Sequence, residues 1–148
     1  FLDDADVSQD IRHVEVTNNT FYIARAPRIR EIMVAWQRQI GRNADLVVEG
    51  RDIGTVVFPG AEYKFYLDAD FNERAGRRLR ELQEKGKDVD DIRLKGELYE
   101  RDRKDYTRTV GPLKKADDAV LIDSTYLTVE QVVDQILGHI RPDTGSPA

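Results

Sequence analysis

The chain has 148 residues, 40% of them apolar and 34% charged, a length and composition that suit one packed domain. It has no cysteine and only two histidines, which excludes disulfides, thiolate metal sites and histidine-rich metal sites. Its net charge of −5 disfavours nucleic acid as a partner, and no apolar run approaches the roughly 20 residues that span a bilayer. We therefore expect a cytoplasmic protein with no metal site, no membrane segment and no nucleic-acid partner.

The first part of the chain contains a weakly patterned stretch and then a helix. Residues 1–20 carry scattered apolar side chains and fit either a strand or a loop. Pro27 stands where a helix can begin, because the first helical turn does not use the N–H that proline lacks. Apolar residues follow it at helical spacing, namely Ile29, Ile32, Met33, Trp36 and Ile40. This spacing predicts an amphipathic helix.

Three short apolar runs predict buried parallel strands at 46–48, 64–67 and 119–122. A polar cluster follows each run, at 49–52, 68–70 and 123–125. Open α/β sheets bind ligands beyond the carboxyl ends of their strands. The three polar clusters therefore predict one ligand-binding edge.

Further helices separate and follow these strands. One begins after Asp70, which precedes Glu73 by three positions in the spacing of a capping box. Another covers about 92–108, and the last begins at Thr128, which forms a second capping-box pattern with Gln131. Strands that alternate with helices predict an α/β layered fold.

The two ends of the chain have distinct features. The chain begins at Phe1 rather than methionine and opens directly on Leu2 and two aspartates, which indicates a truncated start. Its last residues, 141–148, are rich in proline, glycine and small side chains. Termini of this composition are commonly disordered, so we expect a disordered tail there.

The stretch Gly-Arg-Asp-Ile-Gly-Thr at residues 50–55 is the first candidate site. Its glycines let the backbone turn sharply and let a ligand approach closely. Arg51 offers a planar donor fork to a phosphate, and Asp52 can accept hydrogen bonds from sugar hydroxyls or a base amine. The alternative is a plain strand-to-helix turn with an exposed ion pair.

The helix expected at 92–108 carries a second candidate site. Arg101, Asp105 and Arg108 fall at i, i+4 and i+7 and so share one helical face. Two arginines held there by an aspartate could clamp a phosphate. The alternative is a solvated charged face.

Two weaker groups of arginines complete the candidates. Arg30 stands in the first turn of the helix after Pro27, where its charge opposes the helix dipole and favours contact with an anion. Arg74, Arg77 and Arg78 lie on the helix after Asp70, and by themselves they indicate only a basic outer face. For both groups the alternative is an ordinary exposed arginine.

Together and in this order, these segments resemble the cytidylate kinase family. The matching stretches are 48–59, 64–68, 73–78, 82–86, 100–105, 107–120 and 123–125, with 6–8, 11–12 and 16–18 upstream. The resemblance covers roughly residues 2–140, and its most specific part is the motif at 50–55 in register with the later segments.

The resemblance implies a nucleoside monophosphate kinase with a P-loop NTPase-type parallel sheet and helices on both faces. Such an enzyme moves a phosphoryl group from ATP, with Mg²⁺, to CMP or dCMP. Residues 1–16 would be the end of the insert over the monophosphate, 17–140 the core, and a lid would lie near 74–108. The family resemblance also favours a monomer.

The resemblance also implies roles for particular residues. At the monophosphate nucleotide it places Arg30, Arg51, Asp52, Arg101, Asp105 and Arg108. Within this set, Asp52 would lie near the cytosine or sugar, and Asp105 would meet the sugar hydroxyls. It places the lid arginines Arg74, Arg77 and Arg78 at the donor phosphates.

One departure from the family is decisive for this chain. The phosphate-binding motif Gly-x-x-x-x-Gly-Lys-Ser/Thr is absent, and its strand would lie between the strands that end at Arg51 and Asp68. We therefore expect an incomplete sheet with a gap, and a fragment that is inactive by itself. The alternative is a non-catalytic nucleotide-binding remnant that has lost its P-loop, and the sequence upstream of Phe1 distinguishes the two.

Overall fold

The computed structural model describes residues 1–24 and 26–140. Its helices and strands are, in order, α1 (Val14–Ala24), α2 (Pro27–Ile40), β1 (Phe65–Asp68), α3 (Phe71–Glu84), α4 (Asp91–Thr107), β2 (Val120–Asp123) and α5 (Val129–Ile140). Short 3-10 turns occupy Asp10–Arg12 and Gly41–Asn43, and a π-helical turn occupies Ile53–Val57. The tail expected at 141–148 lies outside the described residues.

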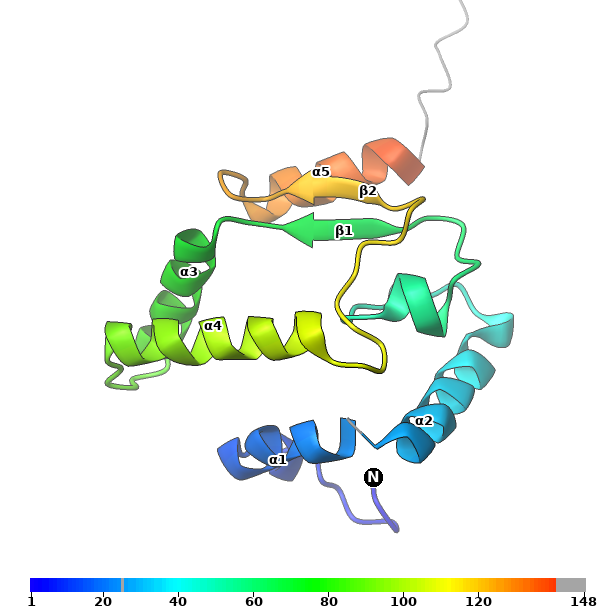
Figure 1. Cartoon of the computed structure of the whole chain (residues 1–148), viewed down its shortest axis with the longest axis horizontal. Helices are drawn as coiled ribbons and strands as arrows, with labels where there is room; N and C mark the ends of the chain where they lie inside the picture. The colour runs from blue at the N-terminus through cyan, green and yellow to red at the C-terminus, as the bar shows by residue number, and fades with distance from the viewer. Residues whose placement is uncertain (25, 141–148) are drawn as a thin grey trace, which may run out of the picture.

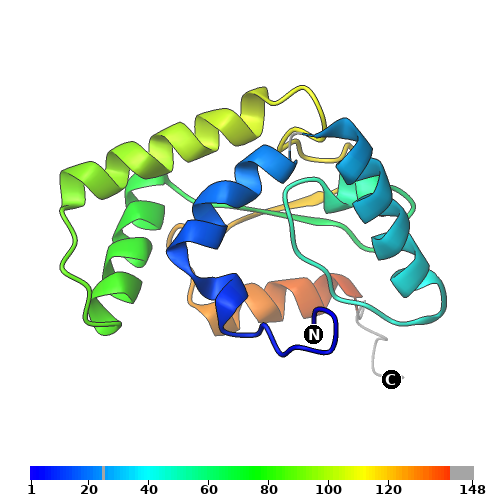
Figure 2. The ribbon, with the colours of Figure 1, turned by 90° about the horizontal axis from the view of Figure 1, so that it is seen from below.

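The two strands form a parallel pair at the centre of the molecule. Phe65 stands opposite Val120 and Asp68 opposite Asp123, so the carboxyl ends of both strands meet at one edge. Helices α4 and α5 lie on opposite sides of this pair (Figure 2), and the Phe65 ring contacts His139 of α5 at a centroid distance of 6.1 Å. The expected α/β layers are thus confirmed, and β1 and β2 lie one residue later than predicted.

The prediction of a strand at 46–48 is wrong. These residues form no strand, and the Val47 side chain is fully exposed. A strand requires a neighbour for its backbone N–H and C=O groups. In the described part of the chain, β1 hydrogen-bonds only to β2, which leaves its other edge open (Figure 1).

The expectation of strand or loop for residues 1–20 is also wrong from Val14 onward, where α1 begins. A helix satisfies most of its backbone hydrogen bonds within itself, so this segment needs no neighbouring strand. The expected boundary between residues 16 and 17 falls inside α1.

The caps predicted for α3 and α5 explain where these helices begin. The Thr128 N–H donates to Gln131 Oε1 at 2.9 Å and the Gln131 N–H donates to Thr128 Oγ1 at 3.2 Å, which is a complete capping box. The Asp70 carboxylate accepts from the N–H of Asn72 at 2.8 Å and of Glu73 at 3.3 Å. Glu73 itself accepts from Arg77, so only the Asp70 half of the second box forms.

Few side chains are fully covered in this arrangement. The buried apolar residues of the described chain are Val57, Ala69, Ala75, Leu94 and Ile122. The apolar stripe of α2 is exposed instead, with Trp36 58% and Ile40 71% accessible. Among the described residues, no helix has the length and apolar character needed to cross a membrane.

Candidate functional site

Asp52 lies between two arginines that come from distant parts of the chain. Its carboxylate pairs with Arg30 from the first turn of α2, and its Oδ1 lies 3.7 Å from Nη2 of Arg108, the C-cap residue of α4. The Asp52 side chain is buried and the two arginines are half-buried, with exposed fractions of 9% for Asp52 and 15% for each arginine. Two cations thus surround one carboxylate in a partly desolvated place, which leaves a net positive charge.

A second ion pair lies between Arg51 and Asp105. Arg51 Nε is 3.0 Å from Asp105 Oδ2, and the Asp105 side chain is 18% exposed. The distance is short, but the N–H is not aimed at this oxygen, and Asp105 Oδ2 is buried without a hydrogen bond. Arg108 Nη2 is likewise buried without a hydrogen bond. A buried donor and a buried acceptor that form no hydrogen bond are costly, so these two atoms are candidates for contact with a polar ligand.

Arg108 directly follows the last residue of α4. The helix stops at Thr107, and Arg108 is its C-cap, with a φ of −64° and an N–H that still donates to the carbonyl of Lys104, so the chain leaves the helix only after this residue. Its Nε donates to the carbonyl of Gly111. Gly111 has a φ of +56°, and a Cβ there would lie 2.6 Å from Arg30 Nη2, so the backbone passes directly over the Asp52 cluster.

Arg101 is not joined to this cluster by a contact. It lies on α4 with an exposed side chain, and in the described part of the chain it forms no ion pair. The structure thus brings together Arg30, Arg51, Asp52, Asp105 and Arg108 through ion pairs. Two further residues contribute to this arrangement and were not singled out from the sequence. Gly111 lies within the family-like stretch 107–120 but carries no side chain that suggests chemistry. Arg38 binds the turn after Asp52 and lies in none of the matching stretches.

The arginines of α3 hold that helix against its neighbours. Arg74 Nη1 lies 2.5 Å from Asp102 Oδ2 on α4, and its Nε donates to the carbonyl of Ala69 at 3.0 Å. Arg77 donates to the carbonyl of Ser124, just after β2, at 2.5 Å. Each of these two arginines therefore reaches a second element.

Arg78 differs from the other two lid candidates because it stays on its own helix. Its Nη1 lies 2.6 Å from Glu81 Oε2. Glu81 also accepts from Lys85 at 2.5 Å. The hydrogen bonds from Lys85 and Arg78 lower the pKa of the exposed Glu81 carboxyl to about 2.

Tyr66 lies on β1 beside the Arg51 side of the site. Burial raises the pKa of its phenol to about 12, and the neighbouring Tyr106 and Asp68 add to this increase while Arg51 opposes it. A phenol with this pKa stays protonated at neutral pH and remains a hydrogen-bond donor.

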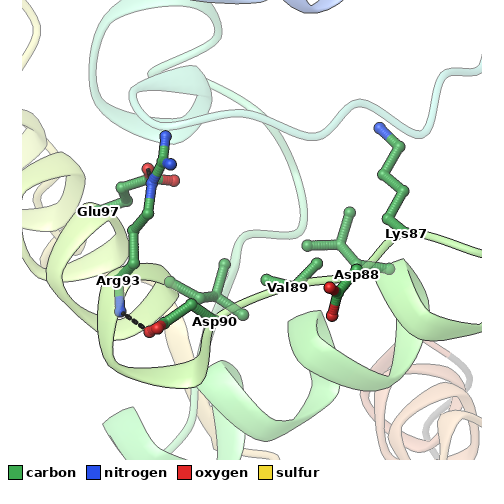
Figure 3. A pocket seen from close by; sticks show the side chains of 8 residues that line it. Lys87, Asp88, Val89, Asp90, Arg93 and Glu97 are labelled. Carbon is green, nitrogen blue, oxygen red and sulfur yellow. Dashed lines mark hydrogen bonds and ion pairs between the residues drawn. The ribbon is translucent and has the colours of Figure 1, made fainter.

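A separate hollow of about 640 Å³ lies between the end of α3 and the start of α4 (Figure 3). Its lining consists of Leu82, Lys87, Asp88, Val89, Asp90, Arg93, Leu94 and Glu97. Arg93 is already paired with Glu97 at 2.8 Å, and none of the candidate site residues contributes to the lining. In residues 1–24 and 26–140, no group of three or more His, Asp or Glu side chains is arranged to hold a metal ion.

Comparison with known proteins agrees with the arrangement of these motifs. The family model described as cytidylate kinase matches residues 1–142. The cytidylate kinase of Aeromonas salmonicida is 46% identical over 97% of this chain and 63% of its own length. Those of Klebsiella pneumoniae and Desulforamulus reducens are each 48% identical over 95% of the chain, and 62% and 63% of their own lengths.

The chain thus spans less than two thirds of the length of these relatives. Its α/β layers with a parallel strand pair agree with the P-loop NTPase type of fold that this family has. On the match over residues 1–142 and the identity to these relatives, the chain belongs to the cytidylate kinase family.

Proposed function

We propose that the full-length protein transfers the terminal phosphoryl group of ATP, with Mg²⁺, to CMP or dCMP and yields CDP or dCDP. The observation that carries this proposal is the partly buried cluster of Asp52 with Arg30 and Arg108, next to the pair of Arg51 and Asp105. Its three arginines outnumber its two carboxylates, so it attracts an anion. The relatives named cytidylate kinase support the choice of nucleotide.

The site residues divide between phosphate and nucleoside in this proposal. Arg30, Arg51, Arg101 and Arg108 meet the monophosphate, for which a guanidinium offers paired donors. Asp105 accepts hydrogen bonds from the sugar hydroxyls, and its Oδ2, which lies beside Arg51 but accepts no hydrogen bond, is available for this role. Asp52 faces the cytosine or the sugar.

Catalysis in this proposal consists of positioning and charge stabilisation without a covalent intermediate. Phosphoryl transfer passes through a loose transition state whose charge lies on the phosphoryl oxygens, so fixed cations lower its energy. Arg74, Arg77 and Arg78 serve the donor phosphates by exchanging carboxylate or carbonyl partners for phosphate oxygens. Mg²⁺ accompanies ATP, and we assign it no ligand in this chain because the described residues contain no cluster that fits it.

A coupled assay of ADP release by the full-length protein tests the proposal. With MgATP as donor, we expect CMP and dCMP to be preferred over other acceptors. A strong preference for AMP or shikimate would sink the proposal. CMP binding without any turnover would instead favour the non-catalytic remnant. We further propose that the protein acts as a monomer in the cytoplasm, where its nucleotide substrates occur.

A further inference from the structure

Arg38 binds the turn that carries Asp52, although no motif singles it out. It lies on α2, and its Nε and Nη2 donate to the carbonyl oxygens of Val57 and Val56 at 2.8 and 2.6 Å. Both carbonyls belong to the π-helical turn Ile53–Val57, for which Asp52 is the N-cap. Arg38 therefore contacts the end of the turn that is opposite to Asp52.

The geometry of this turn explains why it requires an outside donor. The N–H groups of Val56 and Val57 both donate to the carbonyl of Asp52, at 2.8 and 3.2 Å. The turn ends at once, with Phe58 as its C-cap, so no following helical N–H can reach the last carbonyls. The guanidinium of Arg38 supplies these donors, and its positive charge suits the negative end of a helical segment.

Helix α2 holds the same turn at a second point. Arg30 pairs with the Asp52 carboxylate at the start of the turn, and Arg38 binds the carbonyls at its end. Arg30 and Arg38 stand eight positions apart on α2, which corresponds to roughly 12 Å along the helix. The turn is thus held at its start through the Asp52 side chain by one arginine, and at its end through the carbonyls of Val56 and Val57 by another.

We propose that Arg38 is a positioning residue that fixes the Asp52 carboxylate and thereby sets the preference for cytosine over uracil. The inference rests on the proposed function. Of the two contacts proposed there for Asp52, with the cytosine or with the sugar, it chooses the cytosine. Cytosine carries an amine donor where uracil carries a carbonyl acceptor. A carboxylate fixed opposite this position of the base accepts a hydrogen bond from the cytosine amine and repels the uracil carbonyl. The discrimination between the two bases therefore depends on where the carboxylate lies.

The test replaces Arg38 in the full-length protein and compares CMP with UMP as acceptors. We expect Arg38→Gln to lower kcat/KM for CMP about tenfold and for UMP no more than about twofold, since a misplaced hydrogen bond to a charged group is lost only with cytosine. The KM for ATP stays unchanged. For Arg38→Lys we expect a ratio of kcat/KM for CMP to kcat/KM for UMP that lies between those of the wild type and Arg38→Gln, because an ammonium lacks the planar fork that reaches two carbonyls.

Two further variants separate positioning from general stabilisation. Arg28→Gln is the matched control, since Arg28 lies on the same helix, is 89% exposed and pairs only with Glu31 within the described chain. It should leave the CMP to UMP ratio unchanged. In an Asp52→Ala background, Arg38→Gln should change this ratio no further, because no carboxylate remains to be positioned.

If Arg38→Gln lowers kcat/KM by the same factor for CMP and UMP, so that their ratio is unchanged, the inference is overturned and Arg38 is a purely stabilising residue. The inference is also overturned if Arg38→Gln still lowers the CMP to UMP ratio of kcat/KM in the Asp52→Ala background. These outcomes differ from failure of the proposed function, in which the wild-type protein itself does not phosphorylate CMP.

Discussion

Three arginines of similar chemistry differ in what surrounds them, and we expect their replacement to have different effects. Arg108 is 15% exposed and has a buried donor that forms no hydrogen bond, and Arg51 lies against Asp105. Arg80 is 61% exposed, and its ion pair is to Glu73 of its own helix. Replacing Arg51 or Arg108 by alanine in the full-length protein should cost about 1.5–3 kcal/mol in kcat/KM for CMP, the scale of a charge-assisted hydrogen bond.

Arg80→Ala is the control for this pair, and it should change kcat/KM for CMP very little. Steady-state kinetics with CMP as the varied acceptor provides the measurement. Comparable losses at all three positions would contradict the assignment of Arg51 and Arg108 to the monophosphate.

Tyr66 gives the protein a distinct response to alkaline pH. Its pKa in the fold is raised to about 12 by burial, whereas a phenol in an unfolded chain has a pKa of about 10. Its contribution to stability is complete below pH 10 and is lost as the pH rises towards 12, because only the unfolded chain releases the proton there. The free energy of unfolding of Tyr66→Phe should therefore fall less steeply above pH 10 than that of the wild type. Urea unfolding at a series of pH values measures both slopes, and identical slopes would refute the prediction.

At the scale of elements, the predictable helices are those whose signals are local. Pro27 begins α2, Asp70 begins α3 and the box of Thr128 with Gln131 begins α5, and each signal lies within a few residues of the helix it starts. The strand expected at 46–48 depended on a neighbouring strand, and the described residues place none beside it. Local patterns cannot supply hydrogen-bond partners from elsewhere, so this prediction failed while the helices were confirmed.

The same distinction applies to the site. The motif at 50–55 identified Arg51 and Asp52 because their residue types and glycines are adjacent in sequence. Their partners Arg30, Asp105 and Arg108 were picked out by their positions on expected helices and given a role by the resemblance to a family, but which residue pairs with which follows only from folding. The contact of Arg38 with the turn after Asp52 has no signal in the sequence at all.

The capping box of α5 allows a direct test of one such local signal. Thr128→Ala removes the hydroxyl that accepts from the Gln131 N–H, and it should lower the free energy of unfolding by about 1 kcal/mol. Thr128→Ser keeps the acceptor and should restore most of the loss. Chemical denaturation of the full-length protein compares the two, and equal losses in both variants would show that the hydroxyl does not cap the helix.

At the scale of the whole molecule, the main feature is uncovered apolar surface. One edge of β1 has no strand beside it in the described chain, and Trp36, Ile40, Val47 and Val129 are among the exposed apolar side chains. Open strand edges and large apolar patches favour association with other chains. We therefore expect residues 1–148, produced alone, to be poorly stable, to aggregate, or to pair with another chain.

Sedimentation and thermal melting followed by circular dichroism test this expectation. A monomer that melts in one sharp cooperative transition, at a temperature typical of intact mesophilic domains, would show that the expectation is wrong. The same preparation should show no turnover of CMP, and measurable turnover would contradict the predicted inactivity of the fragment.

Two of the carboxylates on helix α4 pair with arginines to which we assign different substrates. Asp102 pairs with Arg74, the lid arginine proposed for ATP, and Asp105 pairs with Arg51, proposed for the acceptor. The two aspartates are three positions apart and therefore neighbours on one helical face. If ATP draws Arg74 away from Asp102, the helix that carries Asp105 loses its ion pair to α3 at the same time. The two substrates would then bind cooperatively, and by thermodynamic reciprocity each would change the affinity for the other by the same factor.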